Sequence, residues 1–179
     1  MKALAGLDAF VDEARRRVGS ADPEALVALM RAAAERRTLP WVDVPLGRET
    51  LLHRSPDLTV FVLSGRPRTA HPPHEHTMGA AIAVLAGAET NVFYREAGPG
   101  DAIREVGRRT AHAGEVMTLD AAVIHAVQYP GDTPTTGLHA YRGDLVGASR
   151  RLWDLRGDRA RPYDQDAYDA LAVPLDPQP

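Results

Sequence analysis

The chain has no cysteine, and it has no long uninterrupted run of apolar residues. Without cysteine, structural disulfides are impossible. Without a long apolar run, no segment could span a membrane, and the N-terminus lacks the apolar stretch of a signal peptide. We therefore expect a cytoplasmic protein that does not associate with membranes.

A strong charge of one sign is also absent. The formal net charge is −3, which gives no electrostatic footprint for nucleic acid. The short basic clusters at residues 15–17, 36–37 and 150–151 stand beside acidic or amphipathic sequence. We interpret them as solvated faces of helices or loops, and we expect no nucleic-acid partner.

Internal repeats of 20 to 50 residues are lacking too. A chain of 179 residues with 44% hydrophobic content is long enough for one domain with a single core. We expect a helical segment over residues 1–40, a β-barrel over 41–146 and a C-terminal arm over 147–179. The end of this arm either wraps around the barrel or is partly disordered, and we expect a monomer or a homodimer.

Local patterns separate the helical part of the chain from the β part. Apolar residues recur at helical spacing over residues 7–18, and a second helix is expected after Asp22-Pro23. From Leu46 onward, short β-rich runs alternate with turn residues. The runs are residues 50–53, 58–63, 78–85, 89–94, 115–119, 123–128 and 136–141. This density of short strands predicts a mainly β protein with a barrel and N-terminal helices.

Three histidines are the most informative feature of the chain. His74 and His76 precede a β-rich run, and alternate residues of a strand point to one face of a sheet. His125 lies in a second β-branched run, and a closed sheet could bring its ring to the same point. Each histidine alone could equally be an ordinary polar residue or a hydrogen-bonded core residue. Together, three converging imidazoles predict a transition-metal site.

The spacing around these histidines resembles the signature of the cupin superfamily. From His76, three residues lead to Ala80 at the glutamate position of that signature, and six more lead to Gly87. In the second half, Gly114 and His125 keep the spacing of the signature. Three other positions keep the spacing but differ in residue type, namely Asp120, Ala122 and Tyr129. The resemblance covers about residues 47–144 and implies one double-stranded β-helix of the jelly-roll type.

Within this superfamily, the chain resembles the cysteine dioxygenase branch. The segments HEHTMGAAIAVLAG and IHAV and the strand Leu138-His139-Ala140-Tyr141 carry this resemblance. It is closest to a small bacterial group of predicted metal-dependent double-stranded β-helix enzymes. Three iron-binding histidines without a carboxylate are typical of this branch, and Ala80 agrees with that pattern. A Ser-x-His-x-Tyr strand supplies polar groups beside the iron there; His139 and Tyr141 match it, whereas Gly137 replaces the serine.

The resemblance implies roles for several side chains. His74, His76 and His125 would hold Fe(II), with Mn, Ni or Zn as possible alternatives. His139 and Tyr141 would be catalytic, with Tyr141 orienting the oxygen. Arg48, or as second choice Arg54, would bind a substrate carboxylate bidentately. The Cys–Tyr crosslink of some cysteine dioxygenases is impossible here because the chain has no cysteine.

These residues together predict a metal-dependent oxygenase that acts on a small anionic molecule with O2. Two alternatives remain open: a redox-neutral isomerase or lyase with a Lewis-acid metal, and a cupin that binds a ligand without turnover. Glu89 follows Gly87 and is a candidate fourth ligand. His71 and His112 lie in loop-like sequence and are expected at the surface or at a pocket rim. His53 lies in a strand without any motif.

Overall fold

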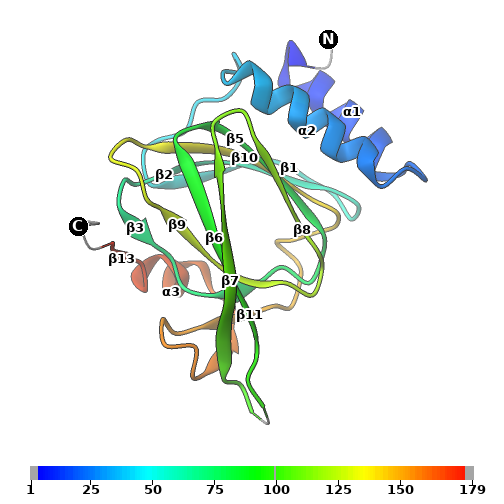
Figure 1. Ribbon diagram of the computed structural model, residues 1–179. Coiled ribbons are helices and arrows are strands. Elements are labelled where there is room, and N and C mark those ends of the chain that lie inside the picture. Colours follow the sequence, from blue (N-terminus) through cyan, green and yellow to red (C-terminus); the bar gives the residue numbers. More distant parts are fainter. Residues whose placement is uncertain (1–3, 99, 176–179) are drawn as a thin grey trace.

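The computed structural model describes residues 4–98 and 100–175. Helices α1 (Leu7–Val18) and α2 (Glu24–Arg36) come first, and a short helix, α3 (Gln165–Ala170), lies near the C-terminal end. Strands make up most of the rest (Figure 1). The strands are β1 (Arg48–Arg54), β2 (Thr59–Gly65), β3 (Thr69–Ala70), β4 (His74–Glu75), β5 (Ala80–Ala86), β6 (Ala88–Glu96), β7 (Ile103–His112), β8 (Val116–Leu119), β9 (Ile124–Tyr129), β10 (Thr135–Tyr141), β11 (Arg151–Trp153), β12 (Ala160–Pro162) and β13 (Val173–Pro174).

The strands form two antiparallel sheets that face each other. The first has the order β1-β2-β10-β5-β8, and β9 is central in the second, where it pairs with β3, β4 and β6. Strands of the first half of the chain pair with strands of the second half, as in β5 with β10 and β6 with β9. The first half of the β region and the second half thus run antiparallel to each other through both sheets, which is the arrangement of a double-stranded β-helix. The predicted mainly β fold, a double-stranded β-helix of the jelly-roll type with N-terminal helices, is confirmed.

The core has a layer on each side of the first sheet. Ala81 and Ala83 of β5 pack in a cluster with Leu29 and Met30 of α2, whereas Ile82 of the same strand packs between the sheets. Because alternate residues face opposite ways and both faces are covered, β5 is a continuous apolar run rather than an alternating one. Gly87 makes the turn into β6 with a φ of +73°, and a Cβ there would lie 2.7 Å from the Thr135 hydroxyl oxygen. Only glycine meets both conditions.

Two details differ from the sequence-based expectation. The strands form a sandwich of two sheets, because no strand pairing within residues 4–98 and 100–175 joins the sheets into a closed barrel. Strand β7 was not predicted. It is a sheet edge that pairs with β6, and most of its residues are exposed on both faces. It therefore lacks the apolar alternation by which strands are recognised. His112, expected in a loop, ends this strand.

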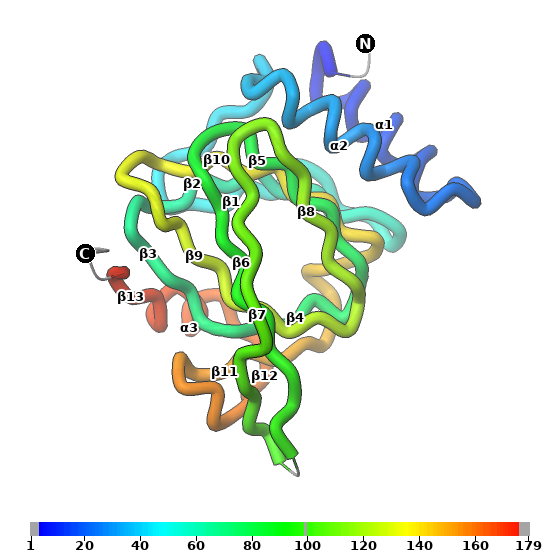
Figure 2. Tube along the Cα trace, in the orientation of Figure 1, coloured from blue at the N-terminus to red at the C-terminus, as the bar shows by residue number. Residues whose placement is uncertain are grey.

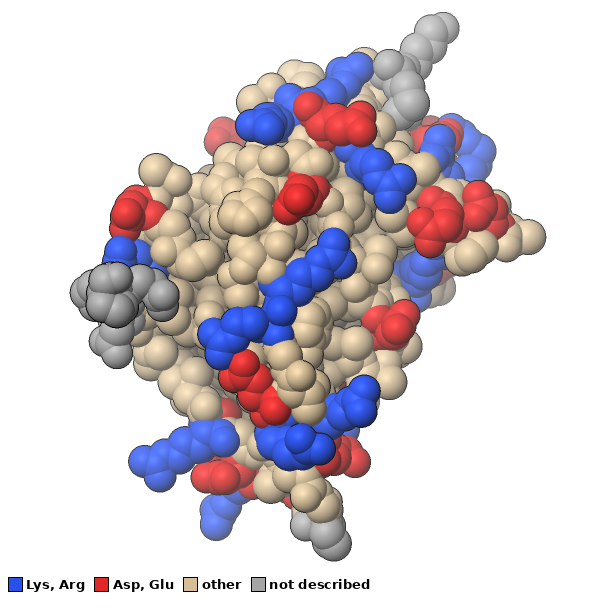
Figure 3. All heavy atoms as spheres, in the orientation of Figure 1, with Lys and Arg blue, Asp and Glu red and all other residues tan. Residues whose placement is uncertain are grey.

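The C-terminal segment contains three short strands and one short helix. Strands β11, β12 and β13 and helix α3 lie against β3, β4 and β9, on the side of the sandwich away from α1 and α2 (Figure 2). The expectation that the tail either wraps around the barrel or is partly disordered covers the chain from Arg161. Residues 161–175 include α3 and β13, whereas residues 176–179 lie outside the described residues. None of the described helices has the length and apolar content needed to cross a membrane. Figure 3 shows basic and acidic side chains interspersed on one face, in agreement with pairs such as Arg108 with Glu105.

Candidate metal centre

Two neighbouring strands bring the three histidines together. His74 of β4 is the direct partner of His125 of β9 in the antiparallel ladder, and His76 follows two residues after His74. Thr77 then adopts a φ of +61°, in the left-handed region, so the extended chain ends directly after His76. Strand β4 ends at Glu75, and His76 is the last residue before the chain turns at Thr77.

Their side-chain nitrogens converge. The Nε2 atom of His76 lies 3.1 Å from Nε2 of His74 and 3.3 Å from Nε2 of His125. One nitrogen from each residue falls within 4.8 Å of the others, and all three side chains are buried. Among the described residues, this set of three histidines is the group of His and acidic side chains that could hold an ion.

Hydrogen bonds fix two of the rings with their lone pairs inward. The Nδ1–H of His74 donates to the carbonyl oxygen of Pro72 at 3.3 Å, and the Nδ1–H of His125 donates to Oδ1 of Asn91 at 2.5 Å. Nε2 of each ring is then unprotonated. Burial lowers the pKa of His74 and His76 well below the ordinary value, and it lowers that of His125 to about 4. All three imidazoles are therefore neutral near pH 7, as metal ligands must be.

This arrangement fits a transition-metal ion. Two imidazole nitrogens that bind one ion at about 2.1 Å each lie roughly 3.0 to 3.4 Å apart, and the two observed separations are 3.1 and 3.3 Å. A proton on Nε2 of His76 could form a hydrogen bond with either His74 or His125. The Nε2 lone pairs of His74 and His125 would still point at the same buried place. A cation at their meeting point removes that repulsion.

Glu89 does not point toward the cluster of His74, His76 and His125. It is fully buried on β6, where one carboxylate oxygen accepts a hydrogen bond from Nδ2 of Asn91 at 2.9 Å. The other oxygen lies 3.4 Å from Nε2 of His139. Burial by itself raises the pKa of Glu89, but His139 and Asn91 outweigh it and hold the pKa below its ordinary value. Glu89 is therefore an anion. Asn91 lies between it and His125 of the histidine cluster, with hydrogen bonds to both.

His139 and Tyr141 lie on β10, and both line the cavity beside the cluster. Nδ1 of His139 and the hydroxyl oxygen of Tyr141 are 3.1 Å apart, within hydrogen-bond distance. The Tyr141 ring meets the His76 ring edge-on at 4.8 Å between centroids. Burial raises the pKa of Tyr141 well above its ordinary value, so the phenol is neutral.

The cavity in front of the histidines is small and opens into a larger groove. It has a volume of about 40 Å³, and the groove has one of about 1090 Å³. Both are lined by Glu49, Phe61, Leu63, Gln165 and Tyr168. A ligand could thus place a small reacting group beside the cluster while the rest of the molecule extends outward.

The C-terminal segment supplies residues that sequence reasoning missed. Arg150, Tyr163, Gln165 and Tyr168 line the cavity. The guanidinium carbon of Arg150 sits 3.3 Å above the centre of the Tyr163 ring, a cation–π contact. Asp164 caps the short helix by accepting from the backbone N–H of Ala167 at 2.8 Å. The cap was a local signal for this helix, but nothing local indicated that the helix covers the histidines.

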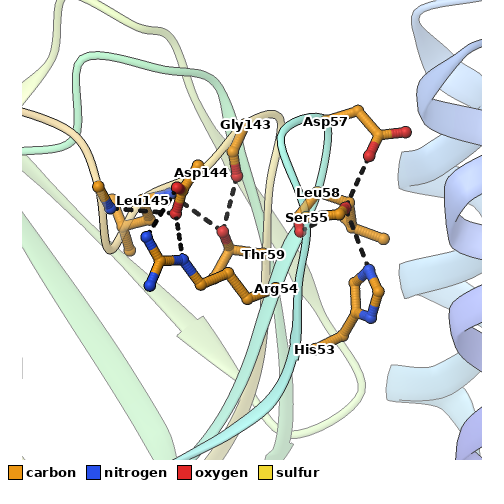
Figure 4. Close-up of polar contacts among 10 residues, drawn as sticks. His53, Arg54, Ser55, Asp57, Leu58, Thr59, Gly143, Asp144 and Leu145 are labelled. Atoms are coloured by element: carbon orange, nitrogen blue, oxygen red, sulfur yellow. Dashed lines mark hydrogen bonds and ion pairs between the residues drawn. The ribbon is translucent and has the colours of Figure 1, made fainter.

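The two arginines predicted to bind substrate lie elsewhere. Arg48 lines the outer groove and not the inner cavity. Arg54 makes two hydrogen bonds with Asp144, at 2.8 and 2.9 Å, and both side chains are partly exposed (Figure 4). Figure 4 also shows His53 beside Ser55, with 3.1 Å between Nε2 of His53 and the Ser55 hydroxyl oxygen. His71 lines the outer groove, as expected for a residue at a pocket rim.

Several solved structures are similar to this chain. A mutant of oxalate decarboxylase from Bacillus subtilis matches at 17% identity and a TM-score of 0.46, over 57% of this chain and 27% of the other. An uncharacterised protein with a double-stranded β-helix domain from Klebsiella pneumoniae matches at 17% identity and a TM-score of 0.47, over 62% and 84%. Hydroquinone 1,2-dioxygenase from a Sphingomonas species matches at 7% identity and a TM-score of 0.44, over 57% and 70%.

These similarities are too weak to identify the activity of this chain, which spans about a quarter of the oxalate decarboxylase chain that it matches. No protein-family model matches the sequence, and no curated protein matches it. The chemistry of the site must therefore be argued from its own residues.

Proposed function

We propose that this chain is a metal-dependent enzyme of the cupin superfamily that adds O2 to a small anionic substrate, as thiol dioxygenases do. The observation that carries the proposal is the donor set: three neutral imidazoles converge on one point, and the nearest buried carboxylate, that of Glu89, faces away. His74, His76 and His125 would hold the ion. We favour Fe(II), with Mn, Ni or Zn as the candidates for redox-neutral chemistry.

A neutral ligand set leaves a divalent ion its full positive charge, which favours an anionic substrate over a neutral one. When bound, Fe(II) would supply the capacity to activate O2 and open positions for the substrate. The protein supplies neutral nitrogens, a cavity lined on one side by Phe61, Leu63 and Leu145, and the buried phenol of Tyr141. These groups exclude water and orient the substrate.

Arg150 is the better candidate for the substrate-binding arginine. It lines the inner cavity with the histidines, whereas Arg48 lies in the outer groove and Arg54 pairs with Asp144. Because its guanidinium stacks on Tyr163, the group is held in place before a ligand arrives. A substrate with a thiolate near the metal and a carboxylate against Arg150 matches this layout. The balanced reaction is RS⁻ + O2 → RSO2⁻, in which both oxygen atoms end on sulfur and no further reductant is consumed.

Metal analysis and O2 consumption test the proposal. Protein purified without added metal is analysed for its metal content, reconstituted with Fe(II) under anaerobic conditions, and then exposed to O2 with a panel of thiol acids and amino acids. We expect O2 uptake above the iron-only control and a product heavier by two oxygen atoms. If no candidate consumes O2 but an isomerase or lyase assay responds under nitrogen, a redox-neutral metalloenzyme replaces this proposal.

A further inference from the structure

Glu89 is a carboxylate sealed inside the sandwich, with a relative exposure of 0%. Burying an unpaired carboxylate costs several kcal/mol. A residue in such a position must therefore be held by specific partners. Nδ2 of Asn91 donates to one oxygen at 2.9 Å, and Nε2 of His139 faces the other oxygen at 3.4 Å.

His139 stands between Glu89 and Tyr141. Its Nδ1 faces the Tyr141 hydroxyl at 3.1 Å, and its Nε2 faces Glu89. Within the described residues, neither this Nε2 nor the facing Oε2 of Glu89 has any hydrogen-bond partner. The two atoms face each other at 3.4 Å. The three side chains therefore form a row that runs from a buried anion to the wall of the cavity.

Gly137 makes room for this row. A Cβ at this position would stand 2.8 Å from Nε2 and 3.2 Å from Cδ2 of His139. Any side chain at residue 137 would push the imidazole away from its present position, with Nε2 toward Glu89. The absence of a side chain at residue 137 and the carboxylate at residue 89 thus belong to one arrangement.

The carboxylate decides which nitrogen of His139 carries the proton. An ionised carboxylate can only accept a hydrogen bond, so a singly protonated His139 carries its proton on the Nε2 that faces Glu89. Nδ1 is then an acceptor, and the hydroxyl group of Tyr141 donates a hydrogen bond to it. The lone pairs of the Tyr141 oxygen are left facing the cavity.

The same carboxylate also reaches the histidine cluster. Asn91 donates to Glu89 and accepts from Nδ1–H of His125 at 2.5 Å. These two hydrogen bonds, from Asn91 to Glu89 and from His125 to Asn91, fix the His125 ring with its Nε2 lone pair toward the proposed ion. A partner of this kind orients the ring of a metal-binding histidine and raises its basicity.

We propose that Glu89 is a positioning residue, which sets the direction of the hydrogen bonds through His139 to Tyr141 and through Asn91 to His125. The Tyr141 oxygen is then a hydrogen-bond acceptor in the cavity. The site therefore prefers a substrate that brings a donor to Tyr141, such as an ammonium or hydroxyl group. The role in turnover rests on the proposed function, whereas the direction of the hydrogen bonds does not.

The test is ¹⁵N NMR of the full-length protein labelled at histidine, with His139 assigned through the His139→Gln protein. In the wild type we expect His139 to carry its proton on Nε2, with Nδ1 unprotonated. The Glu89→Gln substitution keeps the oxygen that accepts from Asn91 but places an NH2 group opposite Nε2. The proton should then move to Nδ1, while the metal content remains that of the wild type. The matched control is Glu105→Gln, on the exposed edge strand β7, which should leave the His139 signals unchanged.

A proton on Nδ1 of His139 in the wild-type protein overturns the inference, and this measurement does not depend on how well any variant folds. An unchanged tautomer in a folded Glu89→Gln protein overturns it as well. A loss of metal from a folded Glu89→Gln protein contradicts the part of the inference that concerns His125, because this substitution keeps the oxygen that accepts from Asn91. In a protein that consumes O2, we expect kcat/KM of Glu89→Gln to fall about 10- to 100-fold. Failure to consume O2 with the wild-type tautomer as stated would overturn the proposed function alone.

Discussion

The Tyr168 ring stands edge-on to the His74 ring, with 5.0 Å between their centroids and 79° between their planes. The same tyrosine stacks on His71 at 4.8 Å with an interplanar angle of 17°. One residue of the C-terminal helix thus contacts both a proposed metal ligand and a residue of the outer groove. The C-terminal helix therefore forms part of the opening of the histidine site.

Replacing Tyr168 by Ala should weaken the packing of the C-terminal helix against His74 and His71. The substitution removes a ring that is 5% exposed, and loss of such a buried aromatic side chain typically costs about 3–5 kcal/mol of stability. We expect a lower melting temperature and a faster loss of metal to a chelator, by roughly tenfold. Tyr168→Phe keeps the ring contacts and should behave like the wild type. If a chelator removes metal from the Ala variant and from the wild type at equal rates, helix α3 does not limit access to the metal.

His125→Ala should remove most of the bound metal, because it deletes one of three ligands and leaves Asn91 without its donor. Circular dichroism and elemental analysis of the same sample separate loss of metal from loss of fold. His112→Ala, at the exposed end of β7, is the matched control and should keep its metal. Full metal occupancy in a folded His125→Ala protein would refute the ligand assignment.

Arg150→Gln should raise KM for an anionic substrate while changing kcat less, since the role we propose for the guanidinium is to bind substrate and not to react. Losing hydrogen bonds to a charged partner costs about 1.5–3 kcal/mol, which corresponds to roughly a 10- to 150-fold rise in KM. Arg54→Gln removes the same charge at the partly exposed pair with Asp144. A larger effect of Arg54→Gln than of Arg150→Gln on KM would reverse our assignment.

The Arg54–Asp144 pair should contribute stability at neutral pH and lose that contribution in acid. The hydrogen bonds from Arg54, followed by that from the backbone of Gly147, hold the pKa of Asp144 below its ordinary value of 3.8. A carboxyl group with a lower pKa in the folded state stabilises that state above the unfolded pKa, and the effect disappears as the pH falls through the folded pKa. Arg54→Gln should therefore unfold at a slightly lower urea concentration than the wild type near neutral pH.

The two proteins should converge as the pH is lowered from about 5 toward about 2, and in high salt near neutral pH, because exposed pairs are screened. A difference between them that stays constant across this pH range would mean that Arg54 acts through packing alone.

Much of the fold could be predicted from the sequence. Each of the seven predicted β-rich runs corresponds to a strand, and both predicted helices are present. Apart from β1, whose residues are exposed or half-buried, these elements have buried residues, so their apolar spacing follows from their geometry. The exposed strand β7 and the short segments β11 to β13 lack that signal. Their pairing depends on partners far away in the sequence.

Part of the candidate site could likewise be predicted from the sequence, and part could not. The spacing of His74, His76 and His125 predicted a common site, and the structure brings their nitrogens together. The same spacing argument could not orient Glu89, since a residue's place in a motif does not show which of its neighbours its side chain meets. It also could not find Arg150 or Tyr168, because those residues reach the cavity only after the C-terminal segment packs against β4.

The sequence by itself determined seven of the strands, the two N-terminal helices and the set of residues able to bind a metal, because periodicity and ligand chemistry are local properties. The tertiary structure alone decided that the carboxylate of Glu89 faces His139, that Arg54 pairs with Asp144 and that Arg150 enters the cavity. Those outcomes depend on which segments become neighbours, and long-range packing decides that.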